Sequence, residues 1–287
     1  MSPHRVSPPK IFPDATHAAK PPSDPAGPAD AFRQTKFMLS DDTEAVLDGL
    51  NLEGTLAKAA SGSKFRNQRV AAGMAMWSKG WLCRLQALHA VEWGSYTAAP
   101  TLVRGAADHL AAQRAVTSIS AAEWDEWLAS GGVGRAPEQQ ATAFRLHPFR
   151  SAETLADDPD LGLLYRAAMD LSMPHFGSTA LLAAAESDEE RVLVTFGDRD
   201  YHQGLAELLL GWLLKLGLAH VAAVSEEDSP FPAAEQEQCA AWIKRAQTIL
   251  QRADRCSMSL LEVDGEQRWL IQHWRRGPTA VPKRVLL

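Results

Sequence analysis

The sequence predicts a mainly α-helical protein: a helical bundle with extra helices, followed by a C-terminal β-hairpin. Three observations support this fold class. Apolar residues recur at spacings of three and four over most of the chain, which is the period of a helix face. Capping residues and glycines stand at the ends of these periodic segments. Near the C-terminus the pattern changes to short strand-like runs around one Asp-Gly pair.

The first segment of the chain is rich in proline. Eight of the 17 prolines fall within the first 28 residues, among many alanines and serines. Such a composition buries too little apolar surface to fold, so residues 1–36 are predicted to form a disordered arm. No continuous apolar run is present that could act as a secretory signal. If the arm is a tether or docking segment, deleting it should leave the melting temperature nearly unchanged.

Residues 37–256 are predicted to form the helical bundle domain. Its first helix begins at N-capping side chains from Ser40 and ends before Gly62. Further helices are expected over about 67–93, 97–119, 120–130, 160–173, 178–186, 201–224 and 233–255. Because Gly94 and Ser95 leave only a short connection, the two long helices on either side must form an antiparallel hairpin.

Two segments of the bundle domain do not fit a simple helical pattern. Residues 131–158 begin with several glycines and contain two prolines, so they are expected to be irregular. Residues 191–196 (RVLVTF) are short and β-branched, so they are compatible with either a strand or a helix.

Residues 205–224 form the most apolar stretch, and it is about long enough to span a bilayer. Glu207, Lys215 and His220 lie within it, however, and a charge at mid-bilayer costs roughly 2.5–3.5 kcal/mol. We therefore expect a helix buried in a soluble core and no membrane partner. Gly211 and Gly217 in the same helix indicate close packing against neighbouring helices, since no phosphate-binding glycine motif is present.

The C-terminal segment, 257–287, is predicted to be a β-hairpin with a basic tail. Strand-like runs over 257–263 and 267–274 flank Asp264-Gly265, the pair that a type I′ turn prefers. The formal net charge is −6 overall but +4 from Gly265 onward, so the preceding body is acidic. The hairpin could bind nucleic acid through Trp and Arg side chains, but the acidic total favours pairing with a partner or with its own body.

The cysteine and metal patterns exclude several classes of protein. Cys83, Cys239 and Cys256 are few, odd in number and without a CxxC pair, which argues against a disulfide scaffold or a zinc site. Reduced thiols in a cytoplasmic protein are expected. His89 and Glu92 are one turn apart, but the Glu-x-x-His pattern of di-iron bundles is missing. We expect no metal and no cofactor.

One polar cluster is a candidate ligand site. Arg104 and Asp108 are four residues apart and share a helix face. Tyr165 and His175, from a later helix and the turn after it, could complete a polar pocket with them. Two alternatives remain open: Arg104 and Asp108 could form a buried ion pair within the helix, since buried charges must be paired, and His175 could cap a helix end.

The motifs around this cluster resemble those of a known family. WGSY (93–96), LVRGAAD (102–108) and LYRAAMDLSMPHF (164–176) occur in this order and spacing. In this they resemble the HEPN-like helical proteins, particularly a poorly characterised bacterial branch, over roughly 67–224. The last turn departs from that pattern, because it reads Pro-His where the family has His-Pro. The resemblance implies a HEPN-like helical bundle.

Some HEPN proteins are ribonucleases with an Arg-x4–6-His motif, which the resemblance would place on Arg104 and His109. A histidine could exchange a proton with the RNA 2′-hydroxyl while an arginine holds the phosphate. The spacing occurs three times in this chain, however, which is about what chance gives. Five residues also turn an α-helix by about 500°, so the two side chains would not share a face.

The sequence therefore predicts a non-catalytic ligand-binding or assembly module, a homodimer with a small-molecule ligand at Arg104, Asp108, Tyr165 and His175. The alternative is a metal-independent endoribonuclease of toxin or defence type, which would bind RNA through Arg104 and His109.

The ribonuclease alternative predicts that the purified protein cleaves total RNA in the presence of EDTA. Arg104→Ala and His109→Ala should each abolish the cleavage, because each would remove one of the two groups that the reaction needs. Intact RNA on a denaturing gel after incubation with the wild-type protein would exclude this activity.

Overall fold

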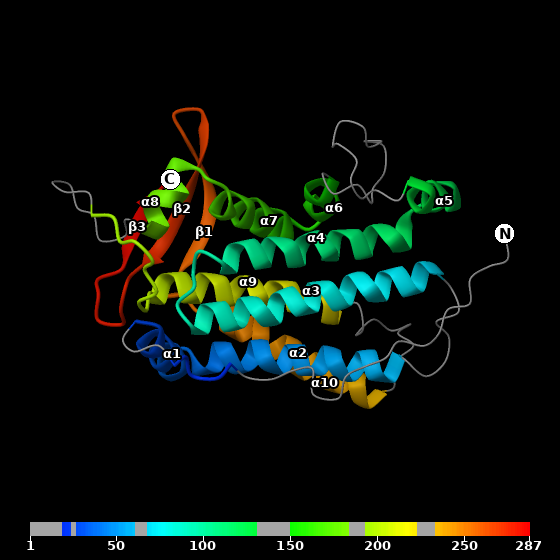
Figure 1. Ribbon diagram of the computed structural model, residues 1–287, viewed down its shortest axis with the longest axis horizontal. Helices are drawn as coiled ribbons and strands as arrows, with labels where there is room; N and C mark the ends of the chain where they lie inside the picture. The colour runs from blue at the N-terminus through cyan, green and yellow to red at the C-terminus, as the bar shows by residue number, and fades with distance from the viewer. Residues whose placement is uncertain (1–18, 24–26, 61–67, 131–149, 184–192, 223–232) are drawn as a thin grey trace.

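The computed structural model describes residues 19–23, 27–60, 68–130, 150–183, 193–222 and 233–287. Within these ranges the chain forms ten helices and one small antiparallel sheet (Figure 1), which confirms the mainly helical class with a C-terminal hairpin. The helices are α1 (Gly27–Met38), α2 (Ser40–Ala60), α3 (Gln68–Glu92), α4 (Ala99–Ser118), α5 (Ala121–Ser130), α6 (Ser151–Ala156), α7 (Pro159–Ser172), α8 (Phe176–Ala183), α9 (Gln203–Ala222) and α10 (Ala233–Leu250). The strands are β1 (Ser257–Val263), β2 (Glu266–Trp274) and β3 (Lys283–Leu286).

Helices α3 and α4 form the antiparallel hairpin that the short connection predicts, and they lie side by side in the middle of the molecule (Figure 1). The turn between them needs Gly94, whose φ is 69°. A Cβ at this position would also overlap the carbonyl oxygen of Arg199. The glycine therefore allows the turn and the chain before α9 to pack against each other.

Helix α9 is the centre of the bundle. It contacts α2, α3, α4, α7 and α10 as well as strands β1 and β2. By length and composition it could cross a membrane, but 78% of its most apolar window is buried inside the protein. Its all-round apolar surface is thus explained by helices on every side, as expected for a core helix.

The sheet packs on one end of the bundle, beside α7 and α9 (Figure 1). Strands β1 and β2 pair in the predicted hairpin, and Asp264 and Gly265 both have positive φ at its turn. The sequence analysis missed β3, which pairs with β2 on the other side. Trp269 and Ile271 of β2 are buried against the helices and attach the sheet to the core.

The predicted disordered arm is wrong for residues 27–36, which belong to α1. Ala31 and Thr35 on this helix are fully buried, and Lys36 forms an ion pair with buried Glu92 at the end of α3. Deleting residues 1–36 would therefore uncover part of the core, and the expectation of an unchanged melting temperature no longer holds. Residues 1–18 and 24–26 lie outside the described ranges.

The two segments without a clear helical pattern are described only in part. Of residues 131–158, those from 151 to 156 form α6, so the expectation of an irregular segment is wrong there, and 131–149 lie outside the description. Of residues 191–196, those from 193 onward form neither helix nor strand.

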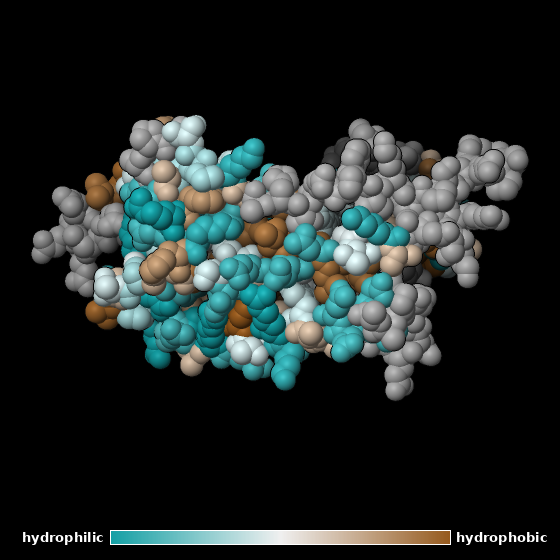
Figure 2. Space-filling model, turned by 90° about the horizontal axis from the view of Figure 1, so that it is seen from below, coloured by the Kyte–Doolittle hydropathy of each residue, from teal (hydrophilic) through white to brown (hydrophobic). Residues whose placement is uncertain are grey.

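Most of the surface in Figure 2 is hydrophilic. This view shows the bundle from below, and teal residues predominate there, with apolar residues exposed in small, separate areas. The distribution agrees with a bundle that places its apolar helix faces inward.

Trp242 of α10 packs closely against two other helices, α2 and α9. Its indole Nε1 donates to the carbonyl oxygen of Ala45 on α2 at 2.8 Å. The ring lies directly against the backbone at Gly49 of α2 and at Gly217 of α9, where a Cβ would come within 2.9 Å of the ring. Such close helix packing at a core glycine was expected for α9 from its sequence.

The Trp242 contact predicts that alanine substitutions at two glycines of α2 change the free energy of unfolding in opposite directions. Gly49→Ala should lower the free energy of unfolding by about 1–3 kcal/mol, because the new methyl group overlaps the indole. Gly54→Ala is the matched control: nothing lies within 4 Å of its Cβ position, so the better helix former should add up to about 1 kcal/mol. Urea unfolding of both variants measures the difference, and equal values would contradict this account.

Candidate functional site

Three of the four residues of the predicted polar cluster meet between α4 and α7. The Tyr165 hydroxyl donates to Asp108 Oδ1 at 3.0 Å. Arg104 Nε lies 3.9 Å from Asp108 Oδ2, and its Nη1 lies 3.8 Å from the sulfur of Met173. Burial and the neighbouring Asp108 carboxylate raise the pKa of Tyr165, so the phenol stays protonated and acts as a donor.

The alternative of an ion pair within α4 agrees with the structure, but the pair is only partly buried. The Arg104 and Asp108 side chains are 35% and 33% exposed to solvent. A partly solvated pair at this distance stabilises the fold by less than about 1 kcal/mol. Both charges are therefore accessible to a ligand or a partner, and their role in binding stays a prediction.

His175, the fourth predicted residue, contacts Asp170 and the first turn of α8. It directly precedes α8, and its carbonyl oxygen accepts a hydrogen bond from the amide of Thr179, as at a helix N-terminus. Its Nε2 is 3.8 Å from Asp170 Oδ1, and Asp170 also accepts a hydrogen bond from the indole of Trp269 at 2.7 Å. No hydrogen bond or ion pair between described residues joins His175 to Arg104, Asp108 or Tyr165.

Arg104 and His109 lie on different sides of α4. Arg104 contacts Met173, which follows α7, whereas the Cβ of His109 packs against α3 at Gly80. Burial and the nearby Lys79 lower the pKa of His109. Within one chain the structure does not bring the two side chains of the predicted ribonuclease motif together.

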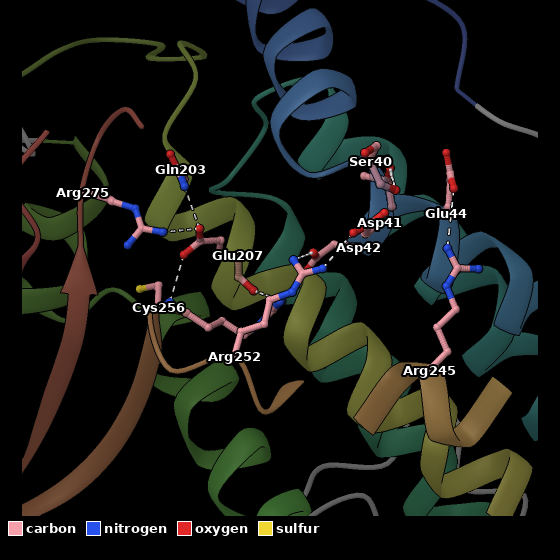
Figure 3. A network of polar contacts seen from close by, with 12 residues as sticks. Ser40, Asp41, Asp42, Glu44, Gln203, Glu207, Arg245, Arg252, Cys256 and Arg275 are labelled. Carbon is pink, nitrogen blue, oxygen red and sulfur yellow. Dashed lines mark hydrogen bonds and ion pairs between the residues drawn. The ribbon is translucent and has the colours of Figure 1, made fainter. Parts of the chain in front are cut away.

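A buried polar network that the sequence analysis missed surrounds Glu207 (Figure 3). This carboxylate on α9 accepts hydrogen bonds from Gln203 at 2.8 Å, from Arg275 at 2.6 Å and from the backbone amide of Cys256 at 2.9 Å. The Glu207 and Arg275 side chains are 7% and 8% exposed. Burial and the Glu207 charge raise the pKa of Cys256 to about 12, so this thiol is not an activated nucleophile.

The network continues to the first turn of α2. Arg255 forms an ion pair with Asp42, which is fully buried, and also donates to the carbonyl oxygen of Glu207. Arg252 donates to Asp42 at 3.0 Å and to Asp41 at 2.9 Å (Figure 3). All these groups are engaged with one another, which marks the network as structural.

A second buried pair lies at the centre of the bundle. Arg84 of α3 donates to Glu53 of α2 at 2.7 Å, and the two side chains are 2% and 1% exposed. The indole of Trp77 donates to the same carboxylate at 2.7 Å. Arg84, one of the three Arg-x4–6-His matches, is thus part of the core.

A cavity of about 820 Å³ lies between α4, α9, α10 and the start of α7. Its apolar lining comes from Leu110, Leu161, Leu218, Ala219, Ala222 and Leu250. Its charged lining comes from Arg114, Asp158, Asp160 and Lys215. None of the four residues of the predicted pocket lines it. The only features that pointed here in the sequence were Lys215 and His220, two polar residues in an otherwise apolar helix.

His220 forms part of the cavity wall. Its ring stacks on Trp77 with centroids 6.4 Å apart. Burial and the charges of Arg84 and Arg114 hold its pKa well below 6.5, so the imidazole is neutral at physiological pH. It therefore offers the cavity one donor or acceptor and no charge.

The comparisons with known proteins add no identification. No protein-family model matches this chain, and no curated protein or solved structure is significantly similar to it. The fold and the cavity define a mainly helical protein with a small C-terminal sheet and a partly open cavity whose apolar walls carry a few charged groups. Among the described residues, no group of three His, Cys, Asp or Glu side chains could hold a metal ion.

His202 gives the fold a pH dependence. Its Nδ1 accepts a hydrogen bond from the amide of Leu205 at 3.2 Å and so caps α9. Burial and the charge of Arg276 lower its pKa to about 4. The unfolded chain, in which a histidine titrates near 6.5, binds more protons between these two values.

The free energy of unfolding should therefore fall by about 2 kcal/mol from this residue alone as the pH drops from 7 to 5. His202→Asn retains a capping acceptor that does not titrate, so the variant should show a flatter pH dependence even if it is less stable. Urea unfolding at both pH values measures the slope. An unchanged slope in the variant would show that other groups control the acid sensitivity.

Proposed function

We propose that this protein is a non-catalytic binding module for a small organic molecule, which it holds in the cavity between α4, α7, α9 and α10. The cavity itself carries the proposal. Its volume of about 820 Å³ falls within the range of about 300–1,000 Å³ that small-molecule sites occupy. Like such sites, it combines apolar walls with a few polar groups that can orient a ligand.

The lining supports binding more than chemistry. Among the described residues, the lining contains no hydroxyl or thiol side chain that could act as a nucleophile. Lys215, which could otherwise serve, donates to Asp160 at 2.6 Å. His220 is a neutral base, but the described lining offers it no hydroxyl or thiol to activate. These groups can recognise a ligand without changing it.

The resemblance adds further predictions, which rest on sequence motifs. They are a HEPN-like bacterial lineage, a homodimer, and the ribonuclease alternative, which the separation of Arg104 from His109 does not favour. A cytoplasmic location belongs to the proposal as well. It is supported by the three free cysteines, two of which are buried in the core.

A neutral fluorescent probe, N-phenyl-1-naphthylamine, can test the cavity. Its fluorescence should rise in the presence of the wild-type protein and saturate at one probe per chain. Ala219→Phe fills the cavity from α9, and Gln247→Trp covers it from an exposed position on α10. Each should weaken binding by about tenfold or more, equivalent to about 1.4 kcal/mol.

The control variant is Phe176→Ser combined with Phe196→Ser. These two phenylalanines are the most exposed ones in the described chain, at 91% and 102%, and do not line the cavity. The control should bind the probe like the wild type. Binding that is lost in the control and retained in both cavity variants would place the probe on the surface and contradict the proposed function.

A further inference from the structure

We propose that the ligand of this cavity is a zwitterion with an apolar group, of the kind represented by an apolar amino acid or a short peptide. This inference rests on the proposed function, because it names the ligand class for the same cavity. Four observations support it: the balance of charge, the accessibility of the charged groups, one unpaired buried acceptor and the apolar walls.

The charged groups of the cavity are arranged as two opposite pairs. Arg114 of α4 lies 4.0 Å from Asp158, and Lys215 of α9 lies 2.6 Å from Asp160. Both acids stand at the start of α7, opposite the two cations. The formal charge of these four groups is zero, and His220 adds none because it is neutral.

The balance of charge disfavours ligands that carry only one sign. The Coulomb energy of two charges depends on their separation and changes sign when one of the charges does. A carboxylate drawn to Arg114 and Lys215 would therefore meet repulsion of similar size from Asp158 and Asp160. An amine would be attracted by the two acids and repelled by the two cations. A zwitterion can place its carboxylate against the cations and its ammonium group against the acids.

The same groups remain accessible to a ligand. Arg114 and Lys215 retain 35% and 33% of their exposure, and the two acids retain 40% and 72%. Partly solvated pairs of this kind contribute little to the stability of the fold. A ligand can therefore insert between them at little cost, unlike at the buried pairs of Glu207 and Glu53.

Gln113 supplies a buried acceptor that lacks a donor. Its Oε1 is shielded from solvent and accepts no hydrogen bond from any described residue, although the side chain lines the cavity. A buried acceptor without a partner destabilises the protein, because it has lost its hydrogen bond to water. A rotation of the Gln113 side chain towards the cavity would let an ammonium or peptide N–H group of the ligand satisfy this acceptor, whereas a carboxylate has no proton to donate.

The apolar part of the cavity wall selects the apolar group of the ligand. Leucines from all four helices and Ala219 form an apolar surface next to the charged groups. Burying an aliphatic or aromatic group of the ligand there favours binding, because its apolar surface is removed from water. The cavity is also larger than one amino acid, so a short peptide with apolar side chains fits the same description.

Isothermal titration calorimetry with four matched compounds tests the ligand class. They are L-phenylalanine, 3-phenylpropionate, 2-phenylethylamine and N-acetyl-L-phenylalanine amide, which share one ring and differ in charge. L-phenylalanine should bind about tenfold or more tightly than each of the other three, which corresponds to about 1.4 kcal/mol.

Two substitutions assign the charges. Arg114→Gln should remove the preference for L-phenylalanine over 2-phenylethylamine, and Asp160→Asn should remove the preference over 3-phenylpropionate. Arg33→Gln, which changes an exposed arginine of α1 paired with Asp30, is the control and should leave all four affinities unchanged.

The outcomes separate this inference from the proposed function. If a compound with one charge or none binds as tightly as L-phenylalanine, or if none of the four binds, the zwitterion inference is overturned. The binding module then still stands, provided that the naphthylamine probe occupies the cavity. If that probe binding is unaffected by both cavity variants, the proposed function itself fails.

Discussion

The carboxylate of Glu207 is buried where the sheet meets the helical bundle, and a buried ionised group must be paired. Its partners come from parts of the chain that are far apart: Gln203 on its own helix, Cys256 at the start of β1 and Arg275 at the end of β2. Arg255 extends the contact to Asp42 on α2. Removing one partner of such a buried pair typically costs about 3–5 kcal/mol, because the other charge is left unpaired. The position of the sheet relative to the bundle depends on this network.

Helix α9 carries polar residues at both ends, and the two ends have different surroundings. At the first end, Glu207 is 7% exposed and is paired with Arg275. Towards the second end, Lys215 is 33% exposed, and α4, α7 and α10 leave a cavity beside it. The first arrangement suits a structural joint, since its charges are buried and paired with one another. The second suits recognition, because its charges are partly solvated and can exchange partners.

Local patterns predicted the local structure, and contacts between distant segments were harder to predict. The hairpin of α3 and α4 follows from a short connection, and the contact of Arg104 with Asp108 follows from a spacing of four. Helix α1 was missed because the proline-rich composition before it conceals a short amphipathic segment. The pair of Arg84 with Glu53 joins residues 31 positions apart, and no spacing rule selects one acid among the 35 in the chain. The cavity was missed for the same reason, because its walls come from four separated segments.

The location of the cavity connects ligand binding to stability. Its walls include α4 and α7 on one side and α9 and α10 on the other, and the ion pairs across it, such as those of Arg114 and Lys215, are weak. A molecule bound only by the folded state adds stability in proportion to the logarithm of its concentration over the dissociation constant. Here that stability would act on the contacts that α4, α7, α9 and α10 make around the cavity. The sheet end, where Glu207 pairs with Arg275, would gain little locally. In the proposed function, the protein thus has a joint that holds the sheet without a ligand and a separate site where a ligand adds its own contacts.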